Sequence, residues 1–422
     1  MSETKVLNRR GLLKKAAGVA AAVMAFPYCV RASALGKNGT VAPSNRITVG
    51  CIGTGGRGRG DMRAFMAEPE VQVLAVCDAD GGHREVARKV AALDAKFSCA
   101  DFRDVLARED IDVVVIATPD HWHVPIAVAA AKAGKDIYCE KPLTLTIGQG
   151  RKLCDAVARY GVVLQVGSQQ RSAAEFQLAC ELVGSGKIGK LKAVKVGLPG
   201  SRSIGPQPVM PVPEGFDYDM WLGPAPWTPY TKLRCHGKFR HIFDYSGGKF
   251  IDWGAHHLDI VQWAIGAKDS GPVEISGWGQ FPKDGIYNTA VQYSIDFVYS
   301  DGTRVNASTE NRGGILFEGS EGRIFVNRGK LELEPQSLVT PGMRRRFGPR
   351  THVRNFLDCV KVRKDPIAPA EVGHRSAAVC HLGNISMRLG RKLRWNPETE
   401  RFVNDAEADR MIWRSMRCPW RL

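Results

Sequence analysis

A glycine-rich loop between an apolar run and a helical stretch constrains this chain more than any other feature. Gly53-Thr54-Gly55-Gly56-Arg57-Gly58 follows the apolar run 47–52. Twenty residues past the loop, a second apolar run, 71–77, ends on Asp78. The order strand, G-x-G-x-x-G loop, helix, strand and acid is typical of a dinucleotide-binding βαβ unit. Glycine turns are common, so the loop alone is also compatible with a structural turn, but its context favours a nucleotide site.

The pattern of elements predicts an α/β chain in two parts. Strand-like and helical stretches first alternate, which predicts a Rossmann doubly wound parallel sheet. The strand-like runs are 47–52, 71–77, 111–117, 136–139 and 162–166, and the helical stretches are 60–67, 82–93, 124–133 and 147–160. Beyond residue 168, alternating apolar and polar residues and the turn Asp301-Gly302 predict an α+β domain on an open, largely antiparallel sheet. These later runs are 291–297, 304–309, 315–317 and 323–326.

The N-terminus resembles an export signal. Asn8-Arg9-Arg10-Gly11-Leu12-Leu13-Lys14 resembles a twin-arginine motif, a modestly apolar stretch 16–26 follows, and Ala32-Ser33-Ala34 offers a cleavage site. A basic tail or a short transmembrane anchor is the alternative, but the stretch is short and alanine-rich for a membrane span. We expect a folded, cofactor-loaded protein in the periplasm or outside the cell, with no membrane span after signal removal.

These patterns divide the chain into five segments. We expect a twin-arginine signal (1–34), a linker (35–45), a nucleotide-binding domain (46–167), an α+β domain (168–385) and a C-terminal arm (386–422). A proline- and aromatic-rich stretch, 201–230, is expected to form a long loop near the junction of the two domains.

Charge and cysteine content exclude several classes of protein. Residues 1–34 carry six basic and one acidic side chain, so without them the formal charge falls from +16 to +11. The remaining basic residues are scattered, without arginine-rich runs, which argues against nucleic acid as a partner. Eleven cysteines without a C-x-x-C pair argue against a zinc site and a disulfide scaffold. We expect no metal and no required disulfide; Cys51, Cys77 and Cys139 lie in apolar runs and should be buried.

Three further clusters carry residues suited to chemistry. Thr118-Pro119-Asp120-His121-Trp122-His123 and Glu140-Lys141-Pro142 each follow a predicted strand, on the sheet edge where ligands bind in α/β folds. In the third cluster, 247–259, Asp252 and His256 are four residues apart and would share a helix face. Taken singly, a lysine before a proline is usually a solvated loop residue, and a histidine in a helix is more often a packing residue.

Together these motifs resemble the glucose–fructose oxidoreductase and inositol dehydrogenase family, often called Gfo/Idh/MocA. The resemblance covers nearly the whole chain from Ile47 onward. It rests on the glycine loop, the Thr118-Pro119 strand end, Glu140-Lys141-Pro142, and the Gly-Gly-x-x-x-Asp-x-Gly-x-His segment ending at His256. The segment 369–376 also resembles the family's late helix, which returns toward the nucleotide domain.

The resemblance implies a catalytic set of Lys141, Asp252 and His256. A histidine is the natural acceptor for a hydroxyl proton, and a protonated Lys141 would stabilise a developing alkoxide. Asp252 would orient the substrate through a second hydroxyl. His257 is an additional histidine that could compete with His256 for the role of base.

The resemblance also implies the cofactor and its contacts. We expect NAD, with NADP possible: Asp78 should favour the ribose hydroxyls of NAD, while Arg57 and Arg59 could soften that preference. Many family members have Asn where this chain has Asp120, which leaves the role of that position open. The expected cofactor contacts are Gly53, Thr54, Gly55, Gly56, Arg57, Gly58, Asp78, Thr118, Pro119, His121, His123, Glu140 and Lys141.

Three functions remain open at this stage. The first is a sugar or cyclitol oxidoreductase acting by hydride transfer. The second is an NAD-dependent glycosidase that oxidises the sugar ring only transiently, and the third is a non-catalytic carbohydrate-binding protein. The partners expected are a sugar or glycoside and further copies of the chain, in a dimer or tetramer formed through the second-domain sheet.

The export signal gives a first testable prediction. Replacing Arg9 and Arg10 by lysine should leave unprocessed precursor in the cytoplasm, because the twin-arginine route depends on that pair. Cell fractionation with immunoblotting measures this, and the Lys14→Arg variant is the control. Unchanged export of the double-lysine variant would contradict the twin-arginine assignment.

Overall fold

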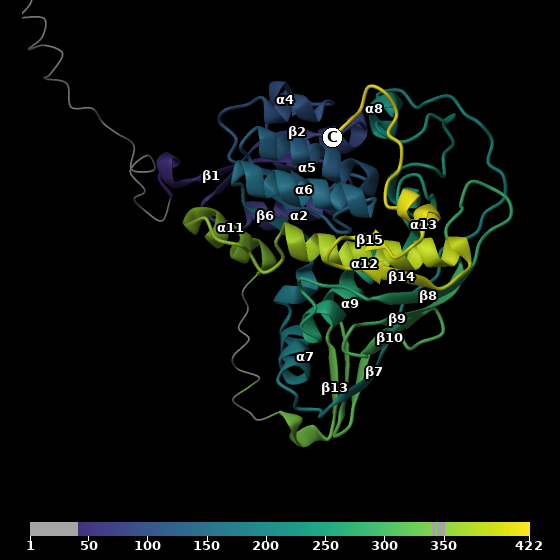
Figure 1. The fold of residues 1–422 in the computed structure, drawn as a ribbon. Coiled ribbons are helices and arrows are strands. Elements are labelled where there is room, and N and C mark those ends of the chain that lie inside the picture. Colours follow the sequence, from purple (N-terminus) through teal and green to yellow (C-terminus); the bar gives the residue numbers. More distant parts are fainter. Residues whose placement is uncertain (1–40, 340–342, 344–350) are drawn as a thin grey trace, which may run out of the picture. The chain divides into compact units, whose positions relative to one another are not determined.

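The structure is a computed structural model that describes residues 41–339, Met343 and residues 351–422 (Figure 1). Residues up to Arg46 and residues 47–422 form two units, and the described part of the first contains the short 3₁₀ helix η2 (Pro43–Asn45). The predicted signal, 1–34, and residues 35–40 of the predicted linker lie outside the described residues. No helix in the described part of the chain has the length and apolar character needed to cross a membrane.

A parallel sheet of order β3-β2-β1-β4-β5-β6 forms the N-terminal domain of the 47–422 unit. Its strands are β1 (Ile47–Ile52), β2 (Val71–Cys77), β3 (Ser98–Cys99), β4 (Val113–Ile116), β5 (Asp136–Cys139) and β6 (Leu164–Val166). The helices between them are α2 (Gly56–Met66), α3 (Gly81–Val90), α4 (Phe102–Leu106), α5 (Asp120–Lys132) and α6 (Ile147–Tyr160), with the 3₁₀ helix η3 (Ala95–Phe97) before β3. The predicted Rossmann fold is therefore confirmed.

Helices cover both faces of this sheet. Side chains of α4, α5 and α6 pack on one face, and those of α2, α3 and α11 (His352–Val362) pack on the other. Every residue of β4 is buried, as expected for a strand covered on both sides. The strand begins at Val113 rather than at 111, and just before it the Asp112 carboxylate accepts hydrogen bonds from Thr48 N (2.9 Å) and Thr48 Oγ1 (2.7 Å). Cys51, Cys77 and Cys139 are buried in β1, β2 and β5, as predicted.

The second domain is built on a mixed sheet of order β13-β12-β11-β7-β10-β9-β8-β14-β15. The strands are β7 (Leu191–Gly197), β8 (Glu274–Gln280), β9 (Gln292–Val298), β10 (Arg304–Ser308), β11 (Gly314–Gly319), β12 (Arg323–Asn327), β13 (Lys330–Glu334), β14 (Leu393–Asn396) and β15 (Arg401–Phe402). Its pairs are antiparallel apart from β7 with β10. The largely antiparallel sheet was predicted, including the hairpin at Gly302, where φ is 85°.

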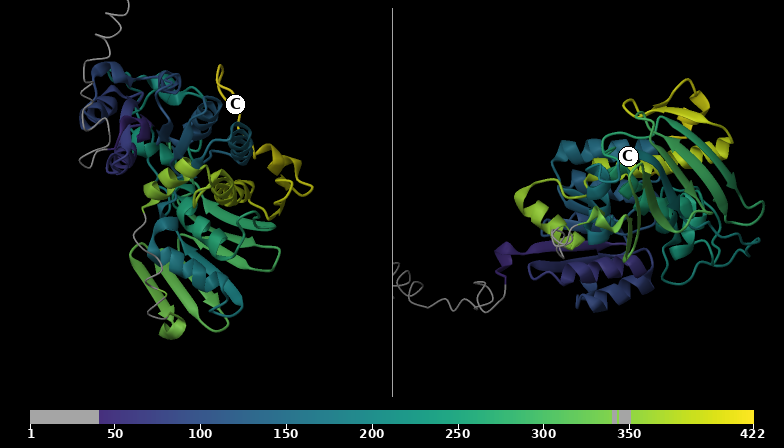
Figure 2. Two further views of the ribbon diagram at one scale, coloured as in Figure 1. Left: turned by 90° about the vertical axis from the view of Figure 1, so that its left-hand side faces the viewer. Right: turned by 90° about the horizontal axis from the view of Figure 1, so that it is seen from below.

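Helices α7 (Ala174–Gly184), α9 (Gly248–Ala264) and α12 (Ala370–Leu389) pack on one face of the second sheet. Figure 2 shows strands of this sheet from its side. The remaining described helices are α8 (Tyr218–Leu222), α13 (Ala406–Arg410) and the 3₁₀ helices η4 (Gln169–Ser172), η5 (His236–His241) and η6 (Gln336–Leu338).

Helix α12 joins the two domains. Figure 1 shows it running between the two sheets, and it packs against α6 and β6 of the first domain and against α9 and β8 of the second. This is the predicted return of the late helix to the nucleotide domain. The predicted boundary at residue 386 falls inside α12, so the C-terminal arm begins after Leu389. The arm adds β14 to the second sheet, and its Trp420 ring lies 4.7 Å from the Trp122 ring.

A buried ion pair fixes α9 to the start of the second domain. Arg171 Nε donates to Asp259 Oδ2 (2.7 Å) and Arg171 Nη2 donates to Asp259 Oδ1 (2.8 Å), while Ser376 Oγ also donates to Oδ1. The two side chains are 5% and 1% exposed, so neither charge can turn to water if its partner is lost.

Removing one partner should therefore destabilise the protein strongly. Asp259→Ala should lower the free energy of unfolding by about 3–5 kcal/mol, because it leaves the Arg171 guanidinium buried and unpaired. Denaturant unfolding measures this. The control is Asp269→Ala, whose carboxylate is 71% exposed and pairs with Lys268 at the surface; it should change stability by less than about 1 kcal/mol. Equal effects of the two variants would contradict this account.

Candidate active site

The glycine loop places the free N-terminus of α2 at the carboxyl edge of the first sheet. Gly53 has φ of 81°, and a Cβ there would lie 2.7 Å from Thr118 N. A Cβ on Gly58 would lie 1.8 Å from the Gly53 carbonyl oxygen. The N-cap residue Gly55 has no side chain to cap α2, so the first N–H groups of the helix are open to an anion such as a pyrophosphate.

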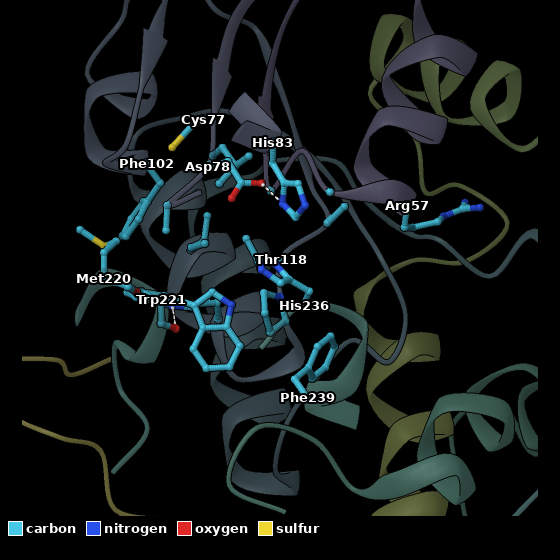
Figure 3. Close-up of a pocket in the computed structure, with 18 of the residues that line it drawn as sticks. Arg57, Cys77, Asp78, His83, Phe102, Thr118, Met220, Trp221, His236 and Phe239 are labelled. Carbon is cyan, nitrogen blue, oxygen red and sulfur yellow. Dashed lines mark hydrogen bonds and ion pairs between the residues drawn. The ribbon is translucent and has the colours of Figure 1, made fainter. Parts of the chain in front are cut away.

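A cavity of about 430 Å³ lies over this loop. It reaches Asp78 at the end of β2 and Thr118 and Pro119 at the end of β4. Figure 3 shows Asp78 and His83 on one side, facing Trp221, His236 and Phe239 on the other. The buried Oγ1 of Thr118 has no hydrogen-bond partner among the described residues. This free hydroxyl, the glycines of the loop and the acid at the end of β2 together fit a dinucleotide.

Asp78 is held ready to accept hydrogen bonds. Its Oδ2 accepts from Thr54 N (2.6 Å), and its Oδ1 accepts from Asp80 N (2.9 Å). Burial raises the pKa of Asp78, while the hydrogen bonds from Asp80 and Thr54 and the nearby His83 oppose that rise. An acid at this position suits ribose hydroxyls and repels an added phosphate.

The two arginines that could have favoured NADP are engaged elsewhere. Arg57 Nη2 pairs with Asp61 (2.6 Å) and with Glu140 (2.8 Å), and Arg59 Nη1 donates to the Thr54 carbonyl (2.7 Å). Burial, with the nearby Glu140, raises the pKa of Asp61 to about 8. Arg57 thus ties the glycine loop to Glu140, the residue before Lys141.

The second domain supplies the outer wall of the cavity, which the sequence pattern did not identify. A segment of the predicted 201–230 loop lies along the turn after β2: Gly81 N donates to the Gly215 carbonyl, and Asp217 N donates to the Ala79 carbonyl, both at 2.9 Å. Trp122 Nε1 donates to the Met220 carbonyl (3.0 Å). The aromatic richness of 201–230 was the available signal, and it did not distinguish this wall from a surface loop.

The structure brings Lys141 and Asp252 together across the two domains. Lys141 Nζ donates to Asp252 Oδ1 (2.8 Å) and to the Asp252 carbonyl (2.9 Å). The same carboxylate receives Lys249 Nζ on Oδ2 (2.8 Å) and Arg240 Nε on Oδ1 (3.3 Å). Burial favours a raised pKa of Asp252, but these three cations hold it far below its usual value. Arg240 also lines the cavity, so this cluster adjoins the coenzyme space.

His256 lies one helical turn beyond Asp252 on α9. Its ring is buried, and its Nδ1 has no hydrogen-bond partner among the described residues. Burial and the positive charge of Lys141 lower the pKa of His256 well below 6.5, so the imidazole is neutral. The pKa of His257 is lowered to about 4 by burial and Arg328. The charges of Lys141 and Asp252 shift the pKa of His256, whereas burial and Arg328 shift that of His257. This difference favours His256 over His257 as the histidine that works with Lys141 and Asp252.

His121 and His123 do not line the cavity, contrary to their predicted contact with the cofactor or substrate. His121 is fully buried and its Nε2 lies 3.0 Å from the Trp221 carbonyl. His123 bridges two carbonyls, with Nδ1 2.7 Å from the Pro142 oxygen and Nε2 2.9 Å from the Thr118 oxygen. The reason is that α5 begins at Asp120, so both side chains turn into the packed interior. His123 thus holds the ends of β4 and β5 from behind, while His121 contacts α8.

The glycine loop yields a prediction for coenzyme binding. Gly58→Ala should weaken NAD binding by about tenfold or more, because the clash with the Gly53 carbonyl displaces the N–H groups of α2. Gly60→Ala on the same helix is the control, since a Cβ there meets nothing within 4 Å. Calorimetric titration of apo-protein with NAD measures both. Equal affinities of the two variants would rule out this loop as the phosphate site.

Comparison with known proteins agrees with this geometry. Residues 47–168 match the family model "Oxidoreductase family, NAD-binding Rossmann fold", and residues 196–422 match "Oxidoreductase family, C-terminal alpha/beta domain". The scyllo-inositol 2-dehydrogenase (NAD(+)) of Bacillus subtilis is 27% identical over 71% of this chain and 81% of its own. A glycosyl hydrolase family 109 protein of Shewanella pealeana is 31% identical over 36% of this chain and 37% of its own.

A solved structure shares the fold. The WlbA dehydrogenase from Bordetella pertussis, in complex with NADH and UDP-GlcNAcA, superposes with a TM-score of 0.65 at 19% identity, over 83% of this chain and 99% of that one. The second-domain family model alone covers more than half of the chain, and both models match in the expected order. The chain belongs to the Gfo/Idh/MocA oxidoreductase family, whose N-terminal domain binds NAD.

Proposed function

We propose that this chain oxidises a CH–OH group of a sugar, a cyclitol or a sugar derivative, with NAD as hydride acceptor. The observation that carries the proposal is the Lys141–Asp252 ion pair, which spans the two domains beside the cavity with the neutral His256 one turn away. A binding protein would have no use for a proton acceptor at that place. The relatives named above include an inositol dehydrogenase, which supports the same substrate class.

Residues around the cavity fit the coenzyme. The N–H groups at Gly55 and Gly56 would hold the pyrophosphate, Asp78 would hold the adenosine ribose, and Thr118 and Pro119 would border the nicotinamide. When bound, NAD supplies the hydride acceptor for the oxidation.

The chain's own residues handle the proton and the charge. His256 is neutral and accepts the hydroxyl proton of the substrate. Lys141 donates a hydrogen bond to the same oxygen and stabilises the negative charge that develops on it. Asp252 holds the Lys141 ammonium in place, because its carboxylate is fixed in turn by Lys249 and Arg240.

A second function, an NAD-dependent glycosidase, is favoured by one observation. Members of glycosyl hydrolase family 109 are among the matched relatives, although the match to the Shewanella pealeana protein spans 37% of its length. The same His256 and Lys141 would serve in a transient oxidation of the ring. Incubation with aryl glycosides separates the two functions: aglycone release without net change in nicotinamide absorbance indicates the glycosidase, and a lasting absorbance change indicates the dehydrogenase.

We also propose that the protein leaves the cytoplasm by the twin-arginine route and assembles as a homo-oligomer. The Arg9-Arg10 motif supports export. For the oligomer, the second sheet offers a surface on β8, where Trp278 is 59% exposed.

The catalytic assignment predicts large losses of rate with little change in folding. His256→Ala and Lys141→Ala should each lower kcat by about 10²–10⁴-fold while NAD binding is retained. Asp252 keeps Lys249 and Arg240 in the Lys141 variant, so the helix remains anchored. Because both residues act on one hydroxyl, the double variant should lose much less than the product of the single losses.

His257→Ala is the matched control and should keep most of its activity. Because the pKa of His256 is lowered, the acid limb of the pH–rate profile should lie below pH 6.5. Steady-state kinetics over a sugar and cyclitol panel measures both effects. An inactive His257→Ala variant beside an active His256→Ala variant would assign the base to His257 instead.

A further inference from the structure

A cluster of cations surrounds Asp252, larger than the proposed hydride transfer requires. Lys141, Lys249 and Arg240 bind the carboxylate directly. Arg202 and Lys238 are both exposed. Their charges, together with that of Lys249, help to lower the pKa of the neighbouring His241 ring. The cationic cluster is therefore Lys141, Arg202, Lys238, Arg240 and Lys249.

Three separate segments build this cluster in the second domain. Arg202 N donates to His241 Nδ1 (3.3 Å), which joins the 201–202 segment to the end of η5. Lys249 N donates to Ser201 Oγ (3.0 Å), which joins the same segment to the start of α9. Arg240, also in η5, lies over the Phe239 ring at 4.7 Å from its centroid. These contacts bring the backbone at Arg202, the end of η5 and the start of α9 next to one another.

Among the described residues, Asp252 is the only acid that forms an ion pair with any of these five side chains. Asp252 contributes one negative charge against five positive side chains. Asp120, whose charge also reaches Arg240 and Asp252, is buried, and burial raises its pKa. His241 adds no positive charge near neutral pH, because burial and the same cations lower its pKa to about 4.

Uncompensated cations at close range repel one another, and the half-buried positions of Arg240 and Lys249 limit screening by solvent. We propose that the substrate carries an anionic group, a carboxylate, a phosphate or a sulfate, which binds among Arg202, Lys238, Arg240 and Lys249. Lys141, which comes from the coenzyme-binding domain, remains for the reacting hydroxyl. This inference rests on the proposed function, in which Asp252 and Lys141 face the substrate.

The anion site can be tested without turnover. Inorganic sulfate is titrated into the NAD-loaded protein, and the unfolding temperature is compared with that in sodium chloride of equal ionic strength. The wild type should gain more stability from sulfate than the Lys238→Gln, Lys249→Gln double variant gains. The amide introduced by Lys249→Gln can still donate to Asp252, so the fold should persist. Lys268→Gln, an exposed residue beyond the end of α9, is the control and should respond as the wild type does.

Sugar probes then identify the group. Calorimetric titration of the NAD-loaded protein with glucose, glucuronate, glucose 6-phosphate and glucose 6-sulfate should show at least one anionic probe binding about tenfold tighter than glucose. The double variant should lose that preference, so that glucose and the anionic probes bind to it with similar affinities. Equal sulfate responses of the wild type, the double variant and Lys268→Gln would overturn the anion site.

The two proposals fail in different ways. A sulfate response that depends on Lys238 and Lys249, without any nicotinamide absorbance change or aglycone release from a broad sugar and glycoside panel, supports the anion site and overturns the proposed function. Turnover of neutral sugars with no such sulfate response overturns the anion site and leaves the proposed function standing.

Discussion

The ion pair between Lys141 and Asp252 is the contact on which the site depends. Its two charges come from different domains, so the pair forms only when the second domain is folded against the carboxyl edge of the first sheet. Each partner is at most 13% exposed, and a lone charge there would be costly. The pair is therefore one of the contacts that position α9, and with it His256, relative to the coenzyme cavity.

A second set of contacts connects the coenzyme loop to the same place. Arg57, in the glycine loop, pairs with Glu140. Gln169 Nε2 donates a hydrogen bond to Oε1 of the same carboxylate (2.8 Å). Glu140 precedes Lys141, so the position of the phosphate-binding loop and that of the substrate lysine are set by adjacent residues. His123 completes this arrangement from behind by contacting the carbonyls of Thr118 and Pro142.

Local patterns in the sequence were enough to predict the Rossmann half. The bounds of β1, β2, β5 and α6 agree with the runs 47–52, 71–77, 136–139 and 147–160. The meeting of Lys141 with Asp252 was also predicted, from family motifs on different domains. Their roles in catalysis stay a prediction.

Features that depend on distant contacts could not be predicted in this way. Strand β7 lies at the centre of the second sheet, between β11 and β10, although it precedes both by more than a hundred residues. No sequence motif predicted the ion pairs that Lys249 and Arg240 form with the Asp252 carboxylate. His121 and His123 were misplaced because a strand end was expected to continue as an open loop, whereas α5 begins at once and turns both rings inward.

Helix α12 has a mechanical consequence. Ala370, near its start, belongs to the core of the first domain, and residues 378–387 belong to the core of the second. A rigid rod embedded in both cores resists the hinge opening by which many two-domain enzymes admit their ligands. The width of the cleft is then set when the chain folds, and under the proposed function a sugar would be selected by its fit to that cleft rather than by closure around it.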